Sequence, residues 1–244
     1  MQATTPILVA DGLHKRFGAL VVLDGVDLSI GEGEALGIVG PNGAGKTTLL
    51  SVLAGAQPPS AGSIRFKDDD VTRLGAPARC RRGLARTHQI PRPFSGMTVF
   101  ENAYVAASQA GGASGDEAYD IATDALAQCD MLKVANRPAE TLGLLARKRL
   151  ELARALATRP SLLLLDEIGG GLTNAEADDL VATIRVLRRR GISIVWIEHI
   201  VQVLVQVAER LICMDAGKII ADGAPQAVLS DKGVVAAYLG GAPA

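Results

Sequence analysis

Short apolar runs alternate with helical patterns along most of this chain. Four runs are apolar over nearly their whole length, which is typical of strands buried on both faces of a sheet. They are residues 35–39, 161–165, 193–197 and 211–214. Helical spacing of apolar residues follows the first run at 46–54 and is longest at 175–190, where Gly191 ends it. This alternation predicts an α/β fold with a mostly parallel core sheet.

Two regions interrupt the alternation. Short, partly alternating segments at 7–9, 26–30 and 63–66 predict a small N-terminal antiparallel β subdomain beside the main sheet. From about residue 98 to residue 156 the pattern is helical, and the Ala/Gly/Ser-rich stretch 106–115 predicts a loop at the end of a helix. We therefore expect a single domain, residues 1–244, with a helical subdomain of about residues 91–157 inserted in the core.

Composition agrees with a folded domain kept in a reducing compartment. The chain has 244 residues, of which 48% are hydrophobic and 21% charged, and this balance argues against disorder. A formal net charge of −1 gives no electrostatic footprint for nucleic acid. Cys80, Cys129 and Cys213 lack the spacing of a zinc or redox pair. No apolar run approaches the roughly 20 residues of a membrane span, and the N-terminus shows no signal-peptide pattern.

The clearest chemical signal follows the first buried strand. Residues 40–47, Gly-Pro-Asn-Gly-Ala-Gly-Lys-Thr, match the P-loop pattern G-x-x-x-x-G-K-[ST] between a strand and a helix. Glycines let backbone N–H groups curve around phosphate oxygens, and the helix N-terminus points its positive end at them. Lys46 supplies a charge to the β- and γ-phosphates, and Thr47 offers a hydroxyl to Mg²⁺. The alternative is an accidental glycine turn, against which Lys46 and Thr47 argue.

Two carboxylates follow the strand 161–165. Asp166 and Glu167 should reach the carboxyl edge of the sheet, where open α/β folds bind ligands. We expect Asp166 to hold Mg²⁺, directly or through water, and Glu167 to polarise an attacking water. His199 follows the strand 193–197, and a neutral histidine there can bond a γ-phosphate. A helix cap for the carboxylates and a structural role for His199 are the alternatives.

Together with Gln89, these residues carry a family resemblance. Their order and spacing resemble the ATP-binding cassette of ABC transporters over nearly the whole chain. The segments 13–20, 86–89 and 196–199, and the ending 237–240, resemble the ATPases of branched-chain amino acid importers. The resemblance implies a P-loop NTPase fold of the ABC ATPase type, with the mostly parallel sheet, the small antiparallel sheet and the inserted helices described above.

The resemblance implies roles for individual residues. Glu167, His199 and Gln89 would be catalytic, and the ligands of Mg²⁺ would be Thr47, Gln89 and Asp166. The residues that would bind ATP are Phe17, Asn42, Gly43, Ala44, Gly45, Lys46, Thr47 and Thr48. Phe17 falls where the family stacks an aromatic ring on adenine. A core position for Phe17 under the small sheet is the other interpretation.

One family motif has drifted. The signature before the helix 147–157 usually reads Ser or Pro, a small or aromatic residue, Gly and Gln. Here these positions hold Gly143, Leu144, Leu145 and Ala146. Leu145 stands where glycine lets the backbone approach the γ-phosphate bound by a partner subunit, and its side chain could block that approach. The ATP site to which this chain lends its signature is therefore expected to be weakened.

The resemblance further implies how the chain works. It would hydrolyse ATP as a homodimer, or as a heterodimer with a homologous ATPase subunit, on the cytoplasmic face of the inner or plasma membrane. Integral membrane permease subunits, fed by a solute-binding protein, would import branched-chain amino acids or related small solutes. Residues 90–98 would lie near the groove for a coupling helix of the permease, with Arg92 and Phe94 as contacts. No nucleic acid is expected as a partner.

Other conspicuous residues have ordinary interpretations. Two basic clusters are interpreted as solvated faces. They are Arg79, Arg81, Arg82 and Arg86, and residues 188–190. The three aspartates at 68–70 are interpreted as a turn, and Asn174 as the cap of the helix that follows it.

Two other functions stay open. A soluble cassette ATPase of DNA repair or translation generally has long coiled-coil insertions or two cassettes in one chain, and neither is found in this sequence. A degenerate regulatory subunit, which binds ATP without useful turnover, is motivated by the drifted signature. The intact Glu167 and His199 argue against that second alternative.

Overall fold

Buried strands form a six-stranded sheet at the centre of the computed structural model, which describes residues 6–240. The strand order is β10-β9-β3-β8-β7-β6. The strands are β3 (Ala35–Val39), β6 (Leu84–Arg86), β7 (Leu162–Asp166), β8 (Ser193–Ile197), β9 (Arg210–Asp215) and β10 (Lys218–Gly223). All neighbours are parallel except β9 and β10. The prediction of a mostly parallel sheet is therefore confirmed.

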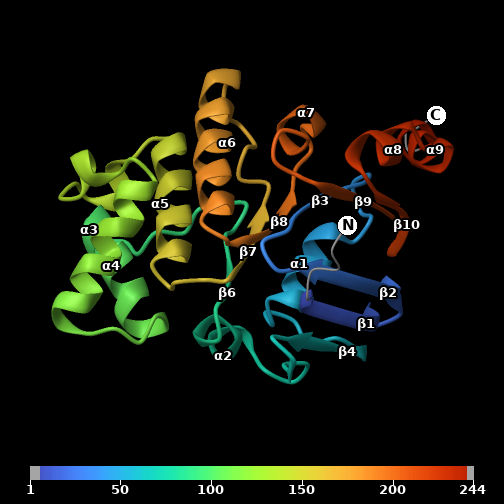
Figure 1. Ribbon diagram of the computed structural model, residues 1–244, viewed down its shortest axis with the longest axis horizontal. Helices are drawn as coiled ribbons and strands as arrows, with labels where there is room; N and C mark the ends of the chain where they lie inside the picture. The colour runs from blue at the N-terminus through green and yellow to red at the C-terminus, as the bar shows by residue number, and fades with distance from the viewer. Residues whose placement is uncertain (1–5, 241–244) are drawn as a thin grey trace.

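A second, antiparallel sheet lies beside the first, as Figure 1 shows for β1, β2 and β4. Its strands, in spatial order, are β2 (Leu20–Gly31), β1 (Pro6–Phe17), β4 (Ala61–Phe66) and β5 (Asp69–Asp70). The predicted antiparallel sheet is confirmed, but β1 and β2 are longer than expected. Their register shifts at several points, and such irregularities interrupt the period of two in the sequence. Asp68 occupies a turn with a φ of 66°, whereas Asp69 and Asp70 pair with β4.

The helices gather around both sheets. They are α1 (Lys46–Leu53), α2 (Ala76–Arg81), α3 (Val99–Val105), η1 (Ala106–Ala110), α4 (Gly115–Gln128), η2 (Leu132–Val134), η3 (Ala139–Thr141), α5 (Leu144–Leu156), α6 (Asn174–Arg189), α7 (Val201–Leu204), α8 (Pro225–Ser230) and α9 (Lys232–Gly240). Figure 1 shows α3, α4 and α5 together at one end of the molecule and α8 and α9 at the other. Within residues 6–240, a helix with the length and apolarity of a membrane span is not found.

Two local predictions about helix ends are wrong. Residues 106–110 continue α3 as a π-helix, because Ala107 is fully buried in the helical core, and the chain becomes irregular only after Gly111. The cap of α6 is Thr173, one residue before the predicted Asn174. The Thr173 hydroxyl accepts a hydrogen bond from Glu176 N, and the Glu176 carboxylate accepts one from Thr173 N. Such a reciprocal pair is worth about 1 kcal/mol to the helix.

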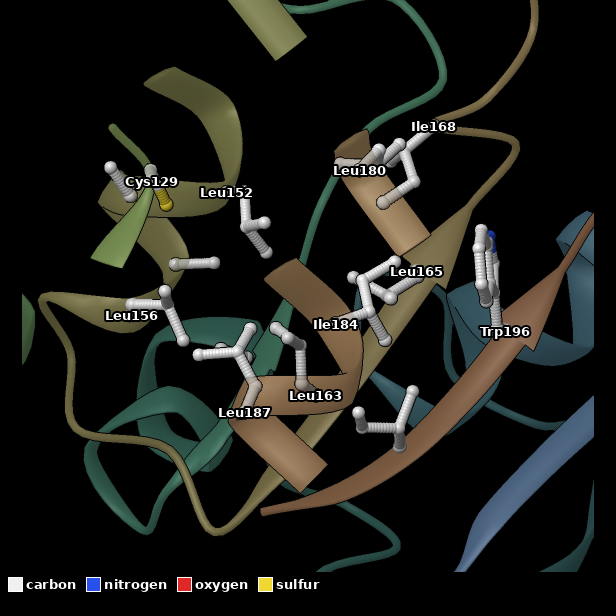
Figure 2. Packing of buried hydrophobic residues seen from close by; sticks show 14 of the residues in the cluster. Cys129, Leu152, Leu156, Leu163, Leu165, Ile168, Leu180, Ile184, Leu187 and Trp196 are labelled. Atoms are coloured by element: carbon white, nitrogen blue, oxygen red, sulfur yellow. The ribbon is translucent and has the colours of Figure 1, made fainter. Parts of the chain in front are cut away.

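The two faces of the main sheet belong to different hydrophobic clusters. In β7, Leu163 and Leu165 face the cluster that contains α5 and α6, whereas Leu162 and Leu164 face the cluster that contains α1. Figure 2 shows the first cluster, where Leu165 lies beside Ile184 of α6. Both faces of β7 are buried, which explains why its sequence is apolar without alternation. Burial of each leucine contributes about 1.5–3 kcal/mol, so the strand that carries Asp166 is firmly held.

The basic cluster around α2 is not the solvated face that the sequence predicts. Arg79 is 0% exposed. Its guanidinium donates hydrogen bonds of 2.7–3.1 Å to the carbonyl oxygens of Val52, Leu53, Thr72 and Leu74. Burial lowers the pKa of Arg79 to about 10, so the group stays charged at neutral pH. Arg79 thereby ties the end of α1 to the loop before α2, while Arg81 and Arg82 are exposed as predicted.

Candidate functional site

The carboxyl ends of parallel strands bring the predicted site residues to one edge of the main sheet. The P-loop, residues 40–47, follows β3, and Glu167 follows β7. His199 comes shortly after β8, and Gln89 shortly after β6. Because parallel strands end at the same edge, Thr47 meets a carboxylate that lies 119 residues further along the chain.

The P-loop surrounds a cavity of about 200 Å³. Its lining consists of Val22, Glu167 and residues 42–48. Gly40 has a φ of 144°, and a Cβ there would lie 2.1 Å from the Met214 carbonyl oxygen, so this position accepts only glycine. Gly45, with a φ of 101°, is the N-cap of α1. The N-terminus of α1 therefore opens onto the cavity and favours an anionic group there.

Lys46 is buried against the loop. Its Nζ atom donates hydrogen bonds to the carbonyl oxygens of Gly40, at 2.7 Å, and Pro41, at 2.9 Å. Burial lowers the pKa of Lys46 below its ordinary value, while the charges of Glu167 and Asp166 oppose that effect. The ammonium group is thus held inside the loop, where a bound phosphate requires a counter-charge.

Asp166 lies between the P-loop and a second basic residue. Its Oδ1 atom is 3.4 Å from Thr47 Oγ1, and its Oδ2 atom accepts a hydrogen bond of 2.8 Å from Arg86. A hydroxyl, a carboxylate and the amide of Gln89 are oxygen donors of the kind that Mg²⁺ prefers, so the donor set fits that ion. The interpretation of Arg86 as part of a solvated face is wrong, because its partner carboxylate is nearly fully buried. No local sequence signal marks this contact, because it depends on the parallel pairing of β6 with β7.

Glu167 is the point at which the three predicted catalytic residues meet. Its Oε1 atom lies 2.7 Å from His199 Nε2, and its Oε2 atom accepts a hydrogen bond from the Gln89 side chain. The residue has a φ of 49°, which is uncommon for a residue with a side chain. Strain of this kind is concentrated at functional sites. A carboxylate that lines the P-loop cavity and contacts an imidazole can accept a proton from a water held there.

Two buried charged residues that the sequence analysis did not single out bond to the backbone at Glu167 and at Gly169. Lys148, on α5, donates a hydrogen bond of 3.3 Å to the Glu167 carbonyl oxygen. Glu198 accepts hydrogen bonds from Gly169 N and Trp196 Nε1. Burial lowers the pKa of Lys148 and raises that of Glu198, and in each case the charge of the other residue opposes the effect. Through Lys148, the helix that begins within the drifted signature touches the backbone of the proposed base.

Phe17 does not reach the wall of the P-loop cavity. It ends β1 and is 47% exposed, which excludes its interpretation as a core residue under the small sheet. Lys15 Nζ lies 4.9 Å from the centre of the Phe17 ring. An exposed aromatic ring can stack on a flat partner, so its contact with adenine stays a prediction.

The drifted signature lies at the start of α5, which begins at Leu144 rather than at the predicted residue 147. Leu144 is exposed, and its Cδ2 atom would lie 3.2 Å from a Cβ built on Gly171. Leu145 and Ala146 are partly buried. This end of α5 therefore places the Leu144 side chain beside Gly171.

A larger cavity, of about 460 Å³, lies away from the P-loop. We call it the α2–α5 groove, because α2, β6, η1 and α5 supply most of its lining. Small side chains such as Ala76, Ala106 and Ala155 form much of its wall, and Phe94 and Cys80 also line it. The groove is therefore suited to an apolar segment.

The buried carboxylate of Glu151, in the α2–α5 groove, contacts His88, the residue before Gln89. Glu151 Oε1 lies 2.8 Å from His88 Nδ1, and Glu151 Oε2 lies 3.1 Å from Arg154. Although burial raises the pKa of Glu151, the hydrogen bond with His88 and the charge of Arg154 lower it overall. Arg154 also lies 4.3 Å from the Phe94 ring and donates a hydrogen bond of 2.6 Å to the Arg92 carbonyl oxygen. The segment that contains Gln89 and Arg92 is thus tied to α5.

The family model described as ABC transporter matches residues 23–169, which include the P-loop, Gln89, Asp166 and Glu167. The chain belongs to the ABC transporter ATP-binding cassettes. Such a cassette hydrolyses ATP, and the cassettes of this family use Mg²⁺ and work as dimers with membrane permease subunits. A second model, described as branched-chain amino acid ATP-binding cassette transporter, matches residues 218–244.

Relatives of this cassette resemble it over nearly their whole length. It is 36% identical to the high-affinity branched-chain amino acid transport ATP-binding protein BraF of Pseudomonas aeruginosa, covering 96% of this chain and 98% of the relative. It is 35% identical to the corresponding protein LivG of Escherichia coli, with the same coverage. It is also 33% identical to the lipopolysaccharide export system ATP-binding protein LptB of Escherichia coli, covering 96% and 97%.

Solved structures agree with the architecture. A nucleotide-free ATP-binding cassette from an ABC transporter superposes with a TM-score of 0.87 at 29% identity, covering 96% of this chain and 99% of that one. The ADP conformation of the cassette MJ1267 gives a TM-score of 0.86 at 30% identity, covering 97% and 100%. The predicted P-loop cassette fold is therefore confirmed.

Proposed function

We propose that this cassette energises an importer of branched-chain amino acids or closely related solutes, from the cytoplasmic face of the membrane. The observation that supports the solute class is the similarity to BraF and LivG, together with the match of residues 218–244 to the branched-chain amino acid model. The similarity to LptB, whose name assigns it to an export system, makes export the competing direction.

In the proposed reaction, Glu167 acts as the general base. A water in the P-loop cavity attacks the γ-phosphorus of ATP, Glu167 takes a proton from that water, and the bond from the γ-phosphorus to the bridging oxygen breaks to leave ADP and phosphate. His199 and Gln89 hold the Glu167 carboxylate and the water in place. Lys46 moves from the carbonyls of the loop to the phosphates. Mg²⁺, held by Thr47, Asp166 and Gln89, would neutralise phosphate charge.

The other ATP contacts in the proposal come from the backbone of the P-loop and from one aromatic ring. The backbone N–H groups of residues 42–48 would surround the phosphates, with the N-terminus of α1 behind them. The Phe17 ring would stack on adenine, and its exposure is what supports that contact.

Import can be tested with the complete transporter. The cassette, its native permease subunits and its solute-binding protein would be reconstituted in liposomes, and uptake of radiolabelled leucine and glutamate would be compared with and without internal MgATP. We expect ATP-dependent uptake of leucine over glutamate, and none from the same complex with Glu167→Gln. Leucine movement only out of the liposomes, or glutamate uptake at an equal rate, would contradict the proposal.

The drifted signature gives a prediction about dimers. Because Leu145 replaces the glycine that approaches the partner's phosphate, hydrolysis by the chain alone should rise little with its own concentration. Leu145→Gly should increase the homodimeric rate about fivefold, since about 1 kcal/mol of steric cost is removed at each site. Steady-state hydrolysis across protein concentration measures both effects. The matched control is Leu132→Gly, an exposed leucine on η2, which should leave the rate unchanged.

We propose the α2–α5 groove as the docking site for the permease, because its apolar wall and the adjoining Arg92 and Phe94 suit a short amphipathic segment. Cys80 in this groove provides the probe. Burial raises the pKa of all three thiols, that of Cys129 to about 12 and that of Cys213 to about 11, but Cys80 is partly exposed whereas the other two side chains are inaccessible. In the native cassette, a maleimide should therefore label Cys80 before the other thiols.

Permease binding should slow the labelling of Cys80 at least tenfold. Mass spectrometry of the labelled cassette, free and in its complex, measures the rate. The unfolded chain, in which all thiols are exposed, serves as the control for intrinsic reactivity. Equal labelling in the free and assembled states would exclude this groove as the docking site.

A further inference from the structure

The C-terminal segment of the described chain packs on the outer strands of the main sheet. Figure 1 shows α8 and α9 beside β9 and β10. Val228 and Val234 are buried in the same hydrophobic cluster as α6, and the Asp231 side chain accepts hydrogen bonds from Gly233 N and Val234 N at the start of α9. This segment is therefore anchored at a fixed position relative to the sheet.

From that position, α9 touches the P-loop. The Tyr238 hydroxyl oxygen accepts a hydrogen bond of 2.8 Å from Gly40 N. Gly40 is buried, and it is not among the residues that line the nucleotide cavity. Tyr238 thus acts on the loop from outside the site, and a direct contact with ATP is not required of it.

Gly40 is the residue at which three constraints on the P-loop meet. Its N–H donates to Tyr238, and its carbonyl oxygen accepts from Lys46 Nζ at 2.7 Å. Its Cα faces the Met214 carbonyl of β9 so closely that no side chain fits. A shift of Gly40 therefore moves the carbonyl oxygen that holds Lys46, the residue that must reach the phosphates. Of the three constraints, the hydrogen bond to Tyr238 is the one that comes from outside the nucleotide-binding core.

We propose that Tyr238 is a positioning residue, through which the C-terminal helix holds the first residue of the P-loop in its phosphate-binding conformation. The hydrogen bond satisfies a buried N–H at the end of β3. With Gly40 fixed, the loop is preformed, and ATP binding does not bear the cost of ordering it.

Tyr238→Phe removes only the hydroxyl and tests this role. We expect the dissociation constant and KM for MgATP to rise about threefold to tenfold, the usual range for one hydrogen bond. The kcat should change by less than twofold, because Glu167, Gln89 and His199 are untouched. Amide hydrogen exchange of a peptide covering residues 36–43 should accelerate in the nucleotide-free protein. The matched control, Tyr119→Phe, changes an exposed tyrosine of α4 and should change none of these quantities.

The inference rests on the nucleotide site proposed above, and the experiment separates the two. If the unmodified chain does not bind MgATP, the nucleotide site itself is wrong. If it binds MgATP and Tyr238→Phe binds it equally well, only the role of Tyr238 is overturned, whatever the exchange rate. A fall in kcat with an unchanged KM would also overturn it, since that result places the effect in the chemical step.

Discussion

Replacing Glu167 by glutamine should lower kcat for ATP hydrolysis by about 10²–10⁴-fold, the usual contribution of a general base. Glutamine keeps the size of the side chain and can still bond to His199 and Gln89, but it cannot accept a proton. The dissociation constant for MgATP should change by less than threefold, because Lys46 and the loop that holds the phosphates are unaltered. Steady-state kinetics and equilibrium binding of MgATP to the same preparation measure the two effects.

A second carboxylate serves as the reference for that experiment. Glu32 is exposed in the turn after β2, so Glu32→Gln changes the net charge by the same amount without touching the site. It should leave kcat and binding unchanged. If Glu167→Gln hydrolyses ATP as fast as Glu32→Gln, Glu167 is not the base. If the unmodified chain and Glu32→Gln both bind MgATP without hydrolysing it, the degenerate regulatory subunit is the better description.

Replacing Arg79 by alanine should destabilise the protein more than any change on its surface. The substitution leaves the carbonyl oxygens of Val52, Leu53, Thr72 and Leu74 without the guanidinium that now satisfies them. Loss of a buried network of this kind costs about 3 kcal/mol or more, which for a domain of this size lowers Tm by about 6–12 °C. Differential scanning calorimetry measures the change in Tm.

The neighbouring arginine gives the control. Arg82 is exposed on the same α2 turn, and Arg82→Ala should shift Tm by less than 2 °C, because surface substitutions are usually worth under about 0.5 kcal/mol. Arg79→Lys should fall between the two, since lysine keeps the charge but has too few donors for the carbonyls. Equal Tm values for Arg79→Ala and Arg82→Ala would show that the buried hydrogen bonds contribute nothing to stability.

Arg79 and Arg82 show which features the sequence does not predict, and the P-loop shows which it does. The P-loop and the strand before Asp166 could be predicted because their signals are contiguous: residue type, spacing and flanking elements all lie within about ten positions. Arg79 and Arg82 have the same residue type and nearly the same neighbours. What distinguishes them is the position of carbonyl oxygens on α1, 26 and 27 residues away from Arg79, and that position is a property of packing.

The interpretation of Arg86 as part of a solvated face is wrong for the same reason, because its partner Asp166 lies 80 residues further along the chain. The cap of α6, in contrast, could have been predicted from the sequence, because Thr173 and Glu176 have the spacing of a capping box. The prediction chose the neighbouring Asn174, one residue too late. The π-helix at residues 106–110 follows from the burial of Ala107 against other small residues. A stretch of Ala, Gly and Ser predicts a loop unless a tightly packed neighbour covers it.

The position of β3 in the main sheet has a consequence for how this chain is made. The strand that carries the P-loop is synthesised before the two strands with which it pairs, β8 and β9, which end at residues 197 and 215. Until those residues leave the ribosome, β3 is an apolar segment with exposed backbone edges, prone to association with other chains. Pairing over such sequence separations is also slow. The sheet around the nucleotide site can therefore close only after β9 has been made, and until then β3 is open to association with other chains.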